Sequence, residues 1–379
     1  MEPEKEGGTS VRGFTYMLAF VPLAVVARFV LPDLPVLLFV LCGLALIALA
    51  AQLGAATEQL AIDTGPRIGG VIQATLSNTA ELIIAAVALK AGHHELVKAS
   101  ITGSIIGNVL LVLGASLLCG GLRNGTQRYD RDLTSIAGSM MLLAVSGLII
   151  PTLFEVLKEV ASATTRVDIF NTTINDPELK AISLGVAAIL ITVYMLSMIY
   201  LLGRGPREAA PGGGEPAAGP GPEAHLAKWN IKTSLAVLTA ATLGVVLMSE
   251  FLVGTIEPVA HSLGLRELFL GVIIIPIACN VAENAVAVTA ALKNDVNLTM
   301  AITFGSTMQV SLFVAPLLVF LGLLFGQTLT LFFSLPEVAV LTLAVLLAAS
   351  ISNDGDSNWL EGAMLLAVWA IAACGFFFL

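Results

Sequence analysis

The chain has 379 residues, of which 57% are hydrophobic and only 12% are charged, and its mean hydropathy is +0.92. A soluble globular domain carries about twice that share of charged residues, so the composition places this chain among membrane proteins. The formal net charge of -9 arises from few charges overall and gives no indication of nucleic-acid binding.

Eleven stretches of the chain are long and apolar enough to cross a bilayer, which takes about 20 mainly apolar residues. In chain order they cover residues 14–31, 36–55, 68–90, 98–120, 132–153, 179–202, 231–252, 267–292, 297–325, 334–351 and 359–379. We therefore predict an all-α integral membrane protein with about 11 transmembrane helices. The acidic residues before the first stretch make a poor signal peptide, so we expect this stretch to be a true helix.

The distribution of Lys and Arg between the connecting segments favours one orientation. More of the 18 basic residues fall on the inner side if the N-terminus is cytoplasmic. We therefore expect a cytoplasmic N-terminus and an external C-terminus, in the cell membrane. The four cysteines have no paired spacing, and we expect free thiols that pack as small hydrophobic side chains. They are Cys42, Cys119, Cys279 and Cys374.

Residues 203–228 are rich in Gly, Pro and Ala, which is typical of a flexible linker and divides the chain into two halves. We expect an N-terminal segment with an extra helix over residues 1–34 and a first five-helix repeat over residues 35–202. The linker then lies on the cytoplasmic side, and a second five-helix repeat covers residues 229–379.

The two halves share an Asn-x-x-Glu motif, at Asn78–Glu81 and at Asn280–Glu283, which are 202 residues apart. The same displacement, without a gap, aligns Gly103-Ser104 with Gly305-Ser306. Paired Asn, Glu and Gly-Ser residues at one register are not a chance result of an apolar composition. The motifs lie in the third and eighth stretches, so an odd number of crossings separates them and the repeats are inverted. Inverted repeats with a substrate site at the membrane midplane are typical of secondary transporters.

The two glutamates are the candidate functional acids because each lies midway along an apolar helix, where a carboxylate is costly. Apart from Arg28, no Lys or Arg lies near the middle of a predicted helix to neutralise them. Asn and Glu three residues apart share one helix face, so Asn78 and Asn280 add amide oxygens. Carboxylate and amide oxygens suit a hard cation such as calcium. Two carboxylates in a dry site cannot both stay ionised without a cation, which couples cation binding to proton release.

A second set of polar side chains comes from the helix that follows each motif. The hydroxyls of Ser104 and Ser306 join the amides of Asn108 and Gln309, one helical turn further on. The glycine before each serine is expected to allow a close backbone approach. Asn108 aligns with a valine in the second half, and Pro276 aligns with an alanine in the first. We therefore predict one shared cation site with unequal halves, in which Pro276 bends one helix and not the other.

Two further acids, Glu58 and Glu257, lie near the predicted ends of the second and seventh helices. Each is either a solvated terminal residue or part of a cation-access or proton-relay path.

The sequence resembles the calcium/cation–proton exchanger family at two signature regions. Residues 69–84 (GGVIQATLSNTAELII) and 103–114 (GSIIGNVLLVLG) look like the first region. Residues 280–288 (NVAENAVAV) and 305–316 (GSTMQVSLFVAP) look like the second. The resemblance extends over nearly the whole chain from the second helix onward.

The resemblance implies a ten-helix core of inverted five-helix repeats with one extra N-terminal helix, and calcium export driven by a proton gradient. It implies that Glu81 and Glu283 bind cation or protons and that six side chains line the site: Asn78, Asn280, Ser104, Asn108, Ser306 and Gln309. It places Glu58 and Glu257 in acidic helices near the cytosolic side. The linker of that family is often acidic and regulatory. Here it carries only three acids, so a calcium-sensing linker is not expected.

We therefore predict a Ca2+/H+ antiporter that works by alternating access. A sodium/calcium exchanger of the same fold and a passive cation channel are the alternatives. Zinc-protease and nucleophile-elbow motifs are absent, so we expect no enzyme activity. The expected partners are Ca2+ and H+ as substrates and the lipid bilayer, without a cofactor or nucleic acid. A homo-oligomer is compatible with the sequence.

Overall fold

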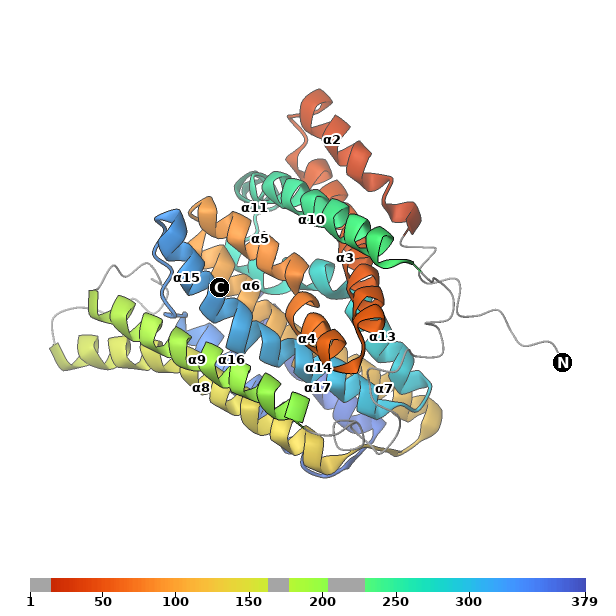
Figure 1. Ribbon diagram of the computed structural model, residues 1–379. Coiled ribbons are helices and arrows are strands. Elements are labelled where there is room, and N and C mark those ends of the chain that lie inside the picture. Colours follow the sequence, from red (N-terminus) through yellow and green to blue (C-terminus); the bar gives the residue numbers. More distant parts are fainter. Residues whose placement is uncertain (1–14, 163–176, 204–228) are drawn as a thin grey trace.

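The computed structural model describes residues 15–162, 177–203 and 229–379, and this part of the chain is almost entirely helical (Figure 1). A two-stranded antiparallel ladder joins β1 (Gln127–Arg128) to β2 (Asp356–Ser357). The linker expected over residues 203–228 lies, apart from its first residue, outside the described residues. All four cysteines are free, as expected.

The first half of the chain contributes helices α2 to α9 and a π-helical turn, η1, where the helix widens. In chain order they are α2 (Phe20–Val30), α3 (Pro35–Thr64), α4 (Pro66–Leu76), α5 (Thr79–Lys90), α6 (His94–Ile106), η1 (Gly107–Val112), α7 (Leu113–Asn124), α8 (Arg131–Ser162) and α9 (Pro177–Gly203).

The second half contributes helices α10 to α17 and two more π-helical turns, η2 and η3. They are α10 (Ile231–Val253), α11 (Ile256–Leu263), α12 (Glu267–Phe269), η2 (Leu270–Ile274), α13 (Ile275–Leu292), α14 (Val296–Gln309), η3 (Val310–Val314), α15 (Ala315–Phe325), α16 (Leu335–Ile351) and α17 (Trp359–Phe378).

These helices confirm the prediction of an all-helical membrane protein. Among the described residues, eight helices are long and apolar enough to cross a membrane, and the bent pair of α4 and α5 makes a ninth. Two shorter apolar helices cover Thr15–Val30 and Leu335–Ile351. Each of the eleven apolar stretches read from the sequence falls on one of these elements.

The largest boundary errors concern two helix ends. α8 was predicted to end at residue 153 and runs to Ser162, and α3 was predicted to end at residue 55 and runs to Thr64. The extension of α3 contains Glu58 and other polar residues that lower the hydropathy. It also contains Ala, Leu, Gln and Glu, which are good helix formers, so the helix continues after its apolar stretch ends.

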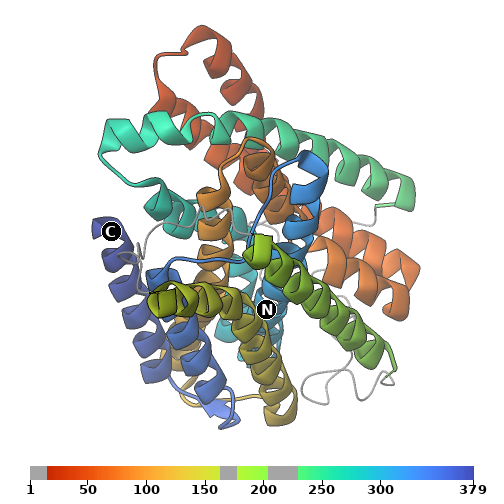
Figure 2. The same cartoon turned by 90° about the vertical axis from the view of Figure 1, so that its left-hand side faces the viewer.

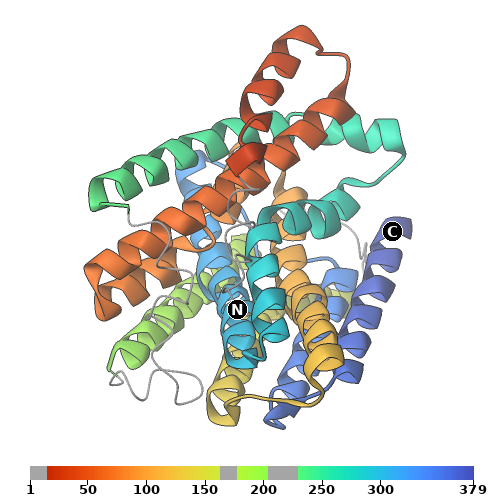
Figure 3. The same cartoon turned by 90° about the vertical axis from the view of Figure 1, so that its right-hand side faces the viewer.

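The N-terminal helices pack at one edge of the molecule. α10 lies along α3, and α2 packs on both (Figure 2). Figure 3 shows α3 and α10 from the opposite side, crossing the bundle beside the helices that carry the two motifs. For orientation, we call the junction of α3 and α4 the α3–α4 end of the bundle, and the junction of α5 and α6 the α5–α6 end.

The loop between α7 and α8 ties the first half to helix ends of the second. Gln127 Nε2 donates to Ala291 O at the end of α13 (2.9 Å), and Asn297 Oδ1 accepts from the Asp130 amide (2.7 Å). Tyr129 Oη donates to Ile351 O at the end of α16 (2.5 Å). Burial, reinforced by nearby carboxylates, raises the pKa of Tyr129 above its usual value, so this phenol stays a donor.

Candidate cation-binding site

The first motif lies at a break between two helices. The sequence had predicted one continuous helix over residues 68–90, and this prediction is wrong. α4 ends at Leu76, α5 begins at Thr79, and the two axes differ by 40°. Asn78 occupies the N-cap position of α5, with φ -96° and ψ 26°. Ser and Asn are unfavourable in a helix interior, so Ser77-Asn78 is the local sequence feature that could have indicated this break.

The second motif lies in an unbroken α-helix. α13 runs from Ile275 to Leu292 through both Asn280 and Glu283. The irregularity comes earlier, at the π-helical turn η2, which ends at Ile274. Pro276 follows two residues later, in the first turn of α13, and removes a backbone donor from the helix. The two halves therefore differ as expected, although the sharp bend occurs in the half that lacks the proline.

Glu81 lies in the first turn of α5, is 6% exposed, and is held by donors from both halves of the chain. Its Oε1 accepts from Ser104 Oγ at 2.7 Å and from Asn280 Nδ2 at 2.6 Å. The N-terminus of a helix also favours negative charge. The arrangement thus orients one carboxylate oxygen firmly and leaves the other available.

Asn78 is the centre of a second hydrogen-bond network, made of neutral groups. Its Nδ2 donates to Gln309 Oε1 (3.0 Å), and its Oδ1 accepts from Ser306 Oγ (3.1 Å). Asn108 Nδ2 donates to the same Ser306 hydroxyl (2.9 Å), and Ser77 donates to Gln309. Side chains from both halves are therefore interlocked on this side of the site.

Glu283 completes the group of eight side chains that the sequence analysis had selected. It interacts with Ser306 and electrostatically with Glu81. All eight therefore lie together, although they are more than 200 residues apart at the extremes. The two motifs have different partners, since Asn280 contacts the opposite glutamate whereas Asn78 contacts Gln309.

Three buried oxygens in this region accept no hydrogen bond: Glu81 Oε2, Glu283 Oε2 and Asn284 Oδ1. A buried oxygen without a donor is unfavourable, so such groups call for a partner. Asn284 was not among the selected residues. It directly follows Glu283 and lies one helical turn after Asn280, and that spacing was the available signal.

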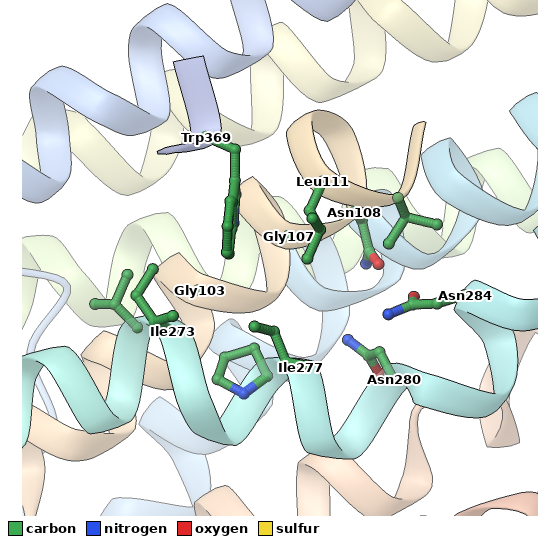
Figure 4. Close-up of a pocket in the computed structure, with 12 residues that line it drawn as sticks. Gly103, Gly107, Asn108, Leu111, Ile273, Ile277, Asn280, Asn284 and Trp369 are labelled. Carbon is green, nitrogen blue, oxygen red and sulfur yellow. The ribbon is translucent and has the colours of Figure 1, made fainter. Parts of the chain in front are cut away.

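A small pocket extends from these residues between α6, α13 and α17. Figure 4 shows the amides of Asn108, Asn280 and Asn284 turned toward this pocket, with the indole of Trp369 on its far side. The pocket wall also includes Gly103, Gly107, Ile273 and Ile277. Polar groups thus converge from one side of the pocket, and apolar groups close it from the other.

Gly103 permits the close packing that brings α6 to η2 and α13. A Cβ atom at this position would lie 2.1 Å from Val272 O and 2.5 Å from the Pro276 ring. The expectation of close approach is therefore correct for Gly103. It is wrong for Gly305, where a Cβ atom would meet no atom within 4 Å.

Glu58 and Glu257 lie at opposite ends of the bundle. The expectation that both acids lie near the cytosolic side is therefore wrong. Glu58 is exposed on α3, toward the α3–α4 end. Glu257 lies beyond α10, in the short helix α11, and interacts electrostatically with Glu267. Glu267 also interacts with His93, at the α5–α6 end. The structure therefore separates these two acids from each other.

A buried ionisable pair outside the site was missed in the sequence. Lys98 on α6 and Glu337 on α16 are each 2% exposed and interact electrostatically. Thr102 Oγ1 donates to Glu337 Oε1 (3.1 Å), and the Ser334 amide and hydroxyl donate to Oε2 (2.9 and 2.7 Å). Both charged residues lie near the ends of their predicted stretches, 98–120 and 334–351. Their burial depends on the packing of α6 against α16.

The donor set of the site is unlike that of a structural metal centre. In the described part of the chain, no group of three or more His, Cys, Asp or Glu side chains is placed to hold a metal ion. The site instead combines two carboxylates with amides and hydroxyls, all of which are hard oxygen donors suited to a cation such as calcium. Fold and site together define a multi-pass membrane transporter.

Comparison with known proteins agrees with this class. The family model of the sodium/calcium exchanger protein matches residues 34–203 and 233–378. The Ca(2+)/H(+) antiporter of Synechocystis is 41% identical over 98% of each chain. The Ca(2+)/H(+) antiporter ChaA of Bacillus subtilis is 40% identical over 97% of this chain and 99% of its own. The chain belongs to the sodium/calcium exchanger family, in its group of Ca2+/H+ antiporters, which is a family of transporters and not of enzymes.

Solved structures share this fold. The structure of native YfkE is 36% identical, covers 97% of this chain and 100% of its own, and superposes with a TM-score of 0.78. The crystal structure of the H+/Ca2+ exchanger CAX has a TM-score of 0.72 at 17% identity, which shows the common fold alone.

Proposed function

We propose that this protein exchanges Ca2+ for H+ across a membrane, with Glu81 and Glu283 as the acids that bind either the cation or protons. The observation that carries the proposal is the meeting of two glutamates, each with one buried carboxyl oxygen that lacks a hydrogen-bond donor. The names of the relatives, which are Ca(2+)/H(+) antiporters, support the choice of substrates.

Calcium binding follows from the geometry of the donors. Oε2 of each glutamate and Oδ1 of Asn284 are the open oxygens, and Glu81 Oε1 is already oriented by two donors. Ca2+ takes six to eight oxygen ligands, so the amide and hydroxyl oxygens nearby supply further ligands. The neutral network around Asn78 holds several of these side chains in place before the cation arrives.

Proton coupling follows from competition for the same oxygens. Two carboxylates that interact in a water-poor site do not both stay charged unless a cation lies between them. Arrival of Ca2+ therefore releases protons, and departure of Ca2+ lets them return. If the site faces one side of the membrane at a time, each cycle exchanges the two ions.

The acids at the two ends of the bundle suggest how ions reach the site. We propose that Glu58 serves access from the α3–α4 end and Glu257 access from the α5–α6 end. The excess of Lys and Arg expected on the cytoplasmic side assigns the α3–α4 end to the cytosol. Labelling of single cysteines introduced at Glu58 and Glu257, from one side of sealed vesicles, tests both assignments.

The experiment on the proposed function is transport in proteoliposomes. The wild-type protein is expected to take up calcium when a proton gradient is imposed, and Glu81→Gln and Glu283→Gln are expected to abolish uptake. Glu178→Gln is the matched control, because Glu178 forms an exposed ion pair with Lys158 far along the sequence from both motifs. Uptake that ignores the pH gradient, or full activity in either site variant, refutes the proposal.

The same proteoliposomes distinguish the proposed function from two alternatives, a sodium/calcium exchanger and a cation channel. For a sodium/calcium exchanger, a sodium gradient at fixed pH drives calcium uptake. For a channel, calcium flux follows its own gradient and continues without a counter-ion.

A further inference from the structure

Tyr194 on α9 is a buried polar side chain that belongs to neither motif. It is 3% exposed, and its Oη donates to Ala74 O at 2.5 Å. Its ring stacks on Phe313, with ring centroids 5.2 Å apart and planes inclined by 24°. One side chain therefore contacts the first motif helix and the second half of the chain together.

The contact with Ala74 falls where the first motif helix is interrupted. The last carbonyls of a helix lack partners within the helix and need donors from elsewhere. At the end of α4, Gln73 O accepts from the Ser77 amide, and Leu76 O accepts from Thr79 Oγ1 (2.7 Å). Ala74 O lies in the same turn and accepts from Tyr194. The Ser77 and Thr79 donors follow α4 directly in the chain, whereas this phenol comes from α9, 120 residues further along the sequence.

The contact with Phe313 falls in η3, the π-helical turn that follows Gln309. Gln309 is in turn the acceptor for Ser77 and Asn78, the two residues within the break. Tyr194 thus contacts Ala74, just before the break, and Phe313, just after Gln309. The contacts form a closed loop from Tyr194 through α4, Asn78 and Gln309 back to Phe313.

We propose that Tyr194 is a positioning residue for the cation site, which holds the break of the first motif helix in register with Gln309. The inference rests on the proposed function, because it assigns Tyr194 a role in calcium binding. The phenol stabilises the interrupted end of α4, and this sets where Asn78 and the following Glu81 lie. The stack of the ring on Phe313 fixes the position of η3, and this keeps Gln309 within hydrogen-bond distance of Asn78.

Tyr194→Phe is the decisive variant, because it removes only the hydroxyl and keeps the ring stack. Tyr129→Phe is the matched control. Tyr129 is also buried, at 7% exposed, and its phenol donates to a helix carbonyl over the same 2.5 Å, but at a loop away from the site. Both variants lose one hydrogen bond of the same kind, so both are expected to lower the melting temperature similarly.

The measurements are direct 45Ca2+ binding to purified protein and proton-driven calcium uptake in proteoliposomes. We expect Tyr194→Phe to raise the calcium concentration for half-maximal binding and uptake about two- to tenfold, as for loss of one neutral hydrogen bond. Tyr129→Phe is expected to leave both values at wild type. Unchanged calcium affinity in Tyr194→Phe, or equal shifts in both variants, overturns the inference.

Failure of the proposed function gives a different result. If the wild-type protein binds calcium but does not exchange it for protons, the antiport proposal is wrong, and the binding comparison still decides the role of Tyr194. Tyr194→Leu, which removes the ring as well, is expected to weaken calcium binding further than Tyr194→Phe. An equal effect of the two overturns the part assigned to the stack on Phe313.

Discussion

Replacing Asn280 with alanine tests the link between the two halves of the site most directly. Asn280 Nδ2 donates to Glu81 Oε1 over 2.6 Å, and both side chains are buried. A hydrogen bond to a charged group contributes about 1.5–3 kcal/mol. If that contribution holds the carboxylate in its cation-binding position, its loss weakens calcium binding about ten- to hundredfold, at about 1.4 kcal/mol per factor of ten.

The matched comparison is Asn78→Ala, which removes the equivalent residue of the first half. Asn78 bonds to neutral partners, Gln309 and Ser306, and such bonds contribute only about 0.5–1.5 kcal/mol each. Of the two asparagines, only Asn280 bonds directly to a carboxylate of the candidate site, so we expect Asn280→Ala to impair calcium binding more than Asn78→Ala. Asn297 accepts a hydrogen bond from a loop amide, and Asn297→Ala is expected to leave calcium affinity unchanged.

The assay is the calcium dependence of proton-driven uptake in proteoliposomes, with calorimetric titration of the purified proteins. Thermal melting of each variant separates a local effect from a loss of fold. Calcium affinity of Asn280→Ala within twofold of wild type, or a larger effect of Asn78→Ala, refutes the reasoning.

Two further predictions concern packing and buried charge. Gly103→Ala is expected to lower the melting temperature and impair transport, because its Cβ would lie 2.1 Å from Val272 O, whereas Gly305→Ala is expected to behave as wild type. Lys98→Met is expected to destabilise the protein by about 3–5 kcal/mol because it leaves the buried Glu337 charge without its partner, and adding Glu337→Gln is expected to recover much of the loss.

Thermal unfolding in one detergent, followed by tryptophan fluorescence, checks both. Equal tolerance of alanine at the two glycines contradicts the close packing of α6 on η2. For the charged pair, Lys158→Met is the control, because the exposed Lys158–Glu178 pair contributes about 0–1 kcal/mol. A double variant at Lys98 and Glu337 that is less stable than Lys98→Met alone contradicts mutual neutralisation.

The helical membrane fold and the grouping of the eight candidate side chains could be predicted from the sequence, because both follow from patterns within single helices and from the internal repeat. An apolar stretch of sufficient length forms a spanning helix whatever its neighbours are. A duplicated Asn-x-x-Glu motif identifies costly polar residues in such helices by itself. Helix boundaries were less certain where polar helix formers extend a helix past its apolar stretch, as in α3.

The tertiary structure alone decided how these residues are used. The same motif lies at a break in α4–α5 and within a continuous helix in α13, and the groups at the break bond to partners from other elements. Tyr194 and Gln309, more than 100 residues away in sequence, supply those partners. Likewise, Lys98 and Glu337 lie near the ends of apolar stretches and become a buried pair only when α6 packs on α16. Sequence spacing specifies which side chains share a helix face, whereas packing between helices specifies which faces meet.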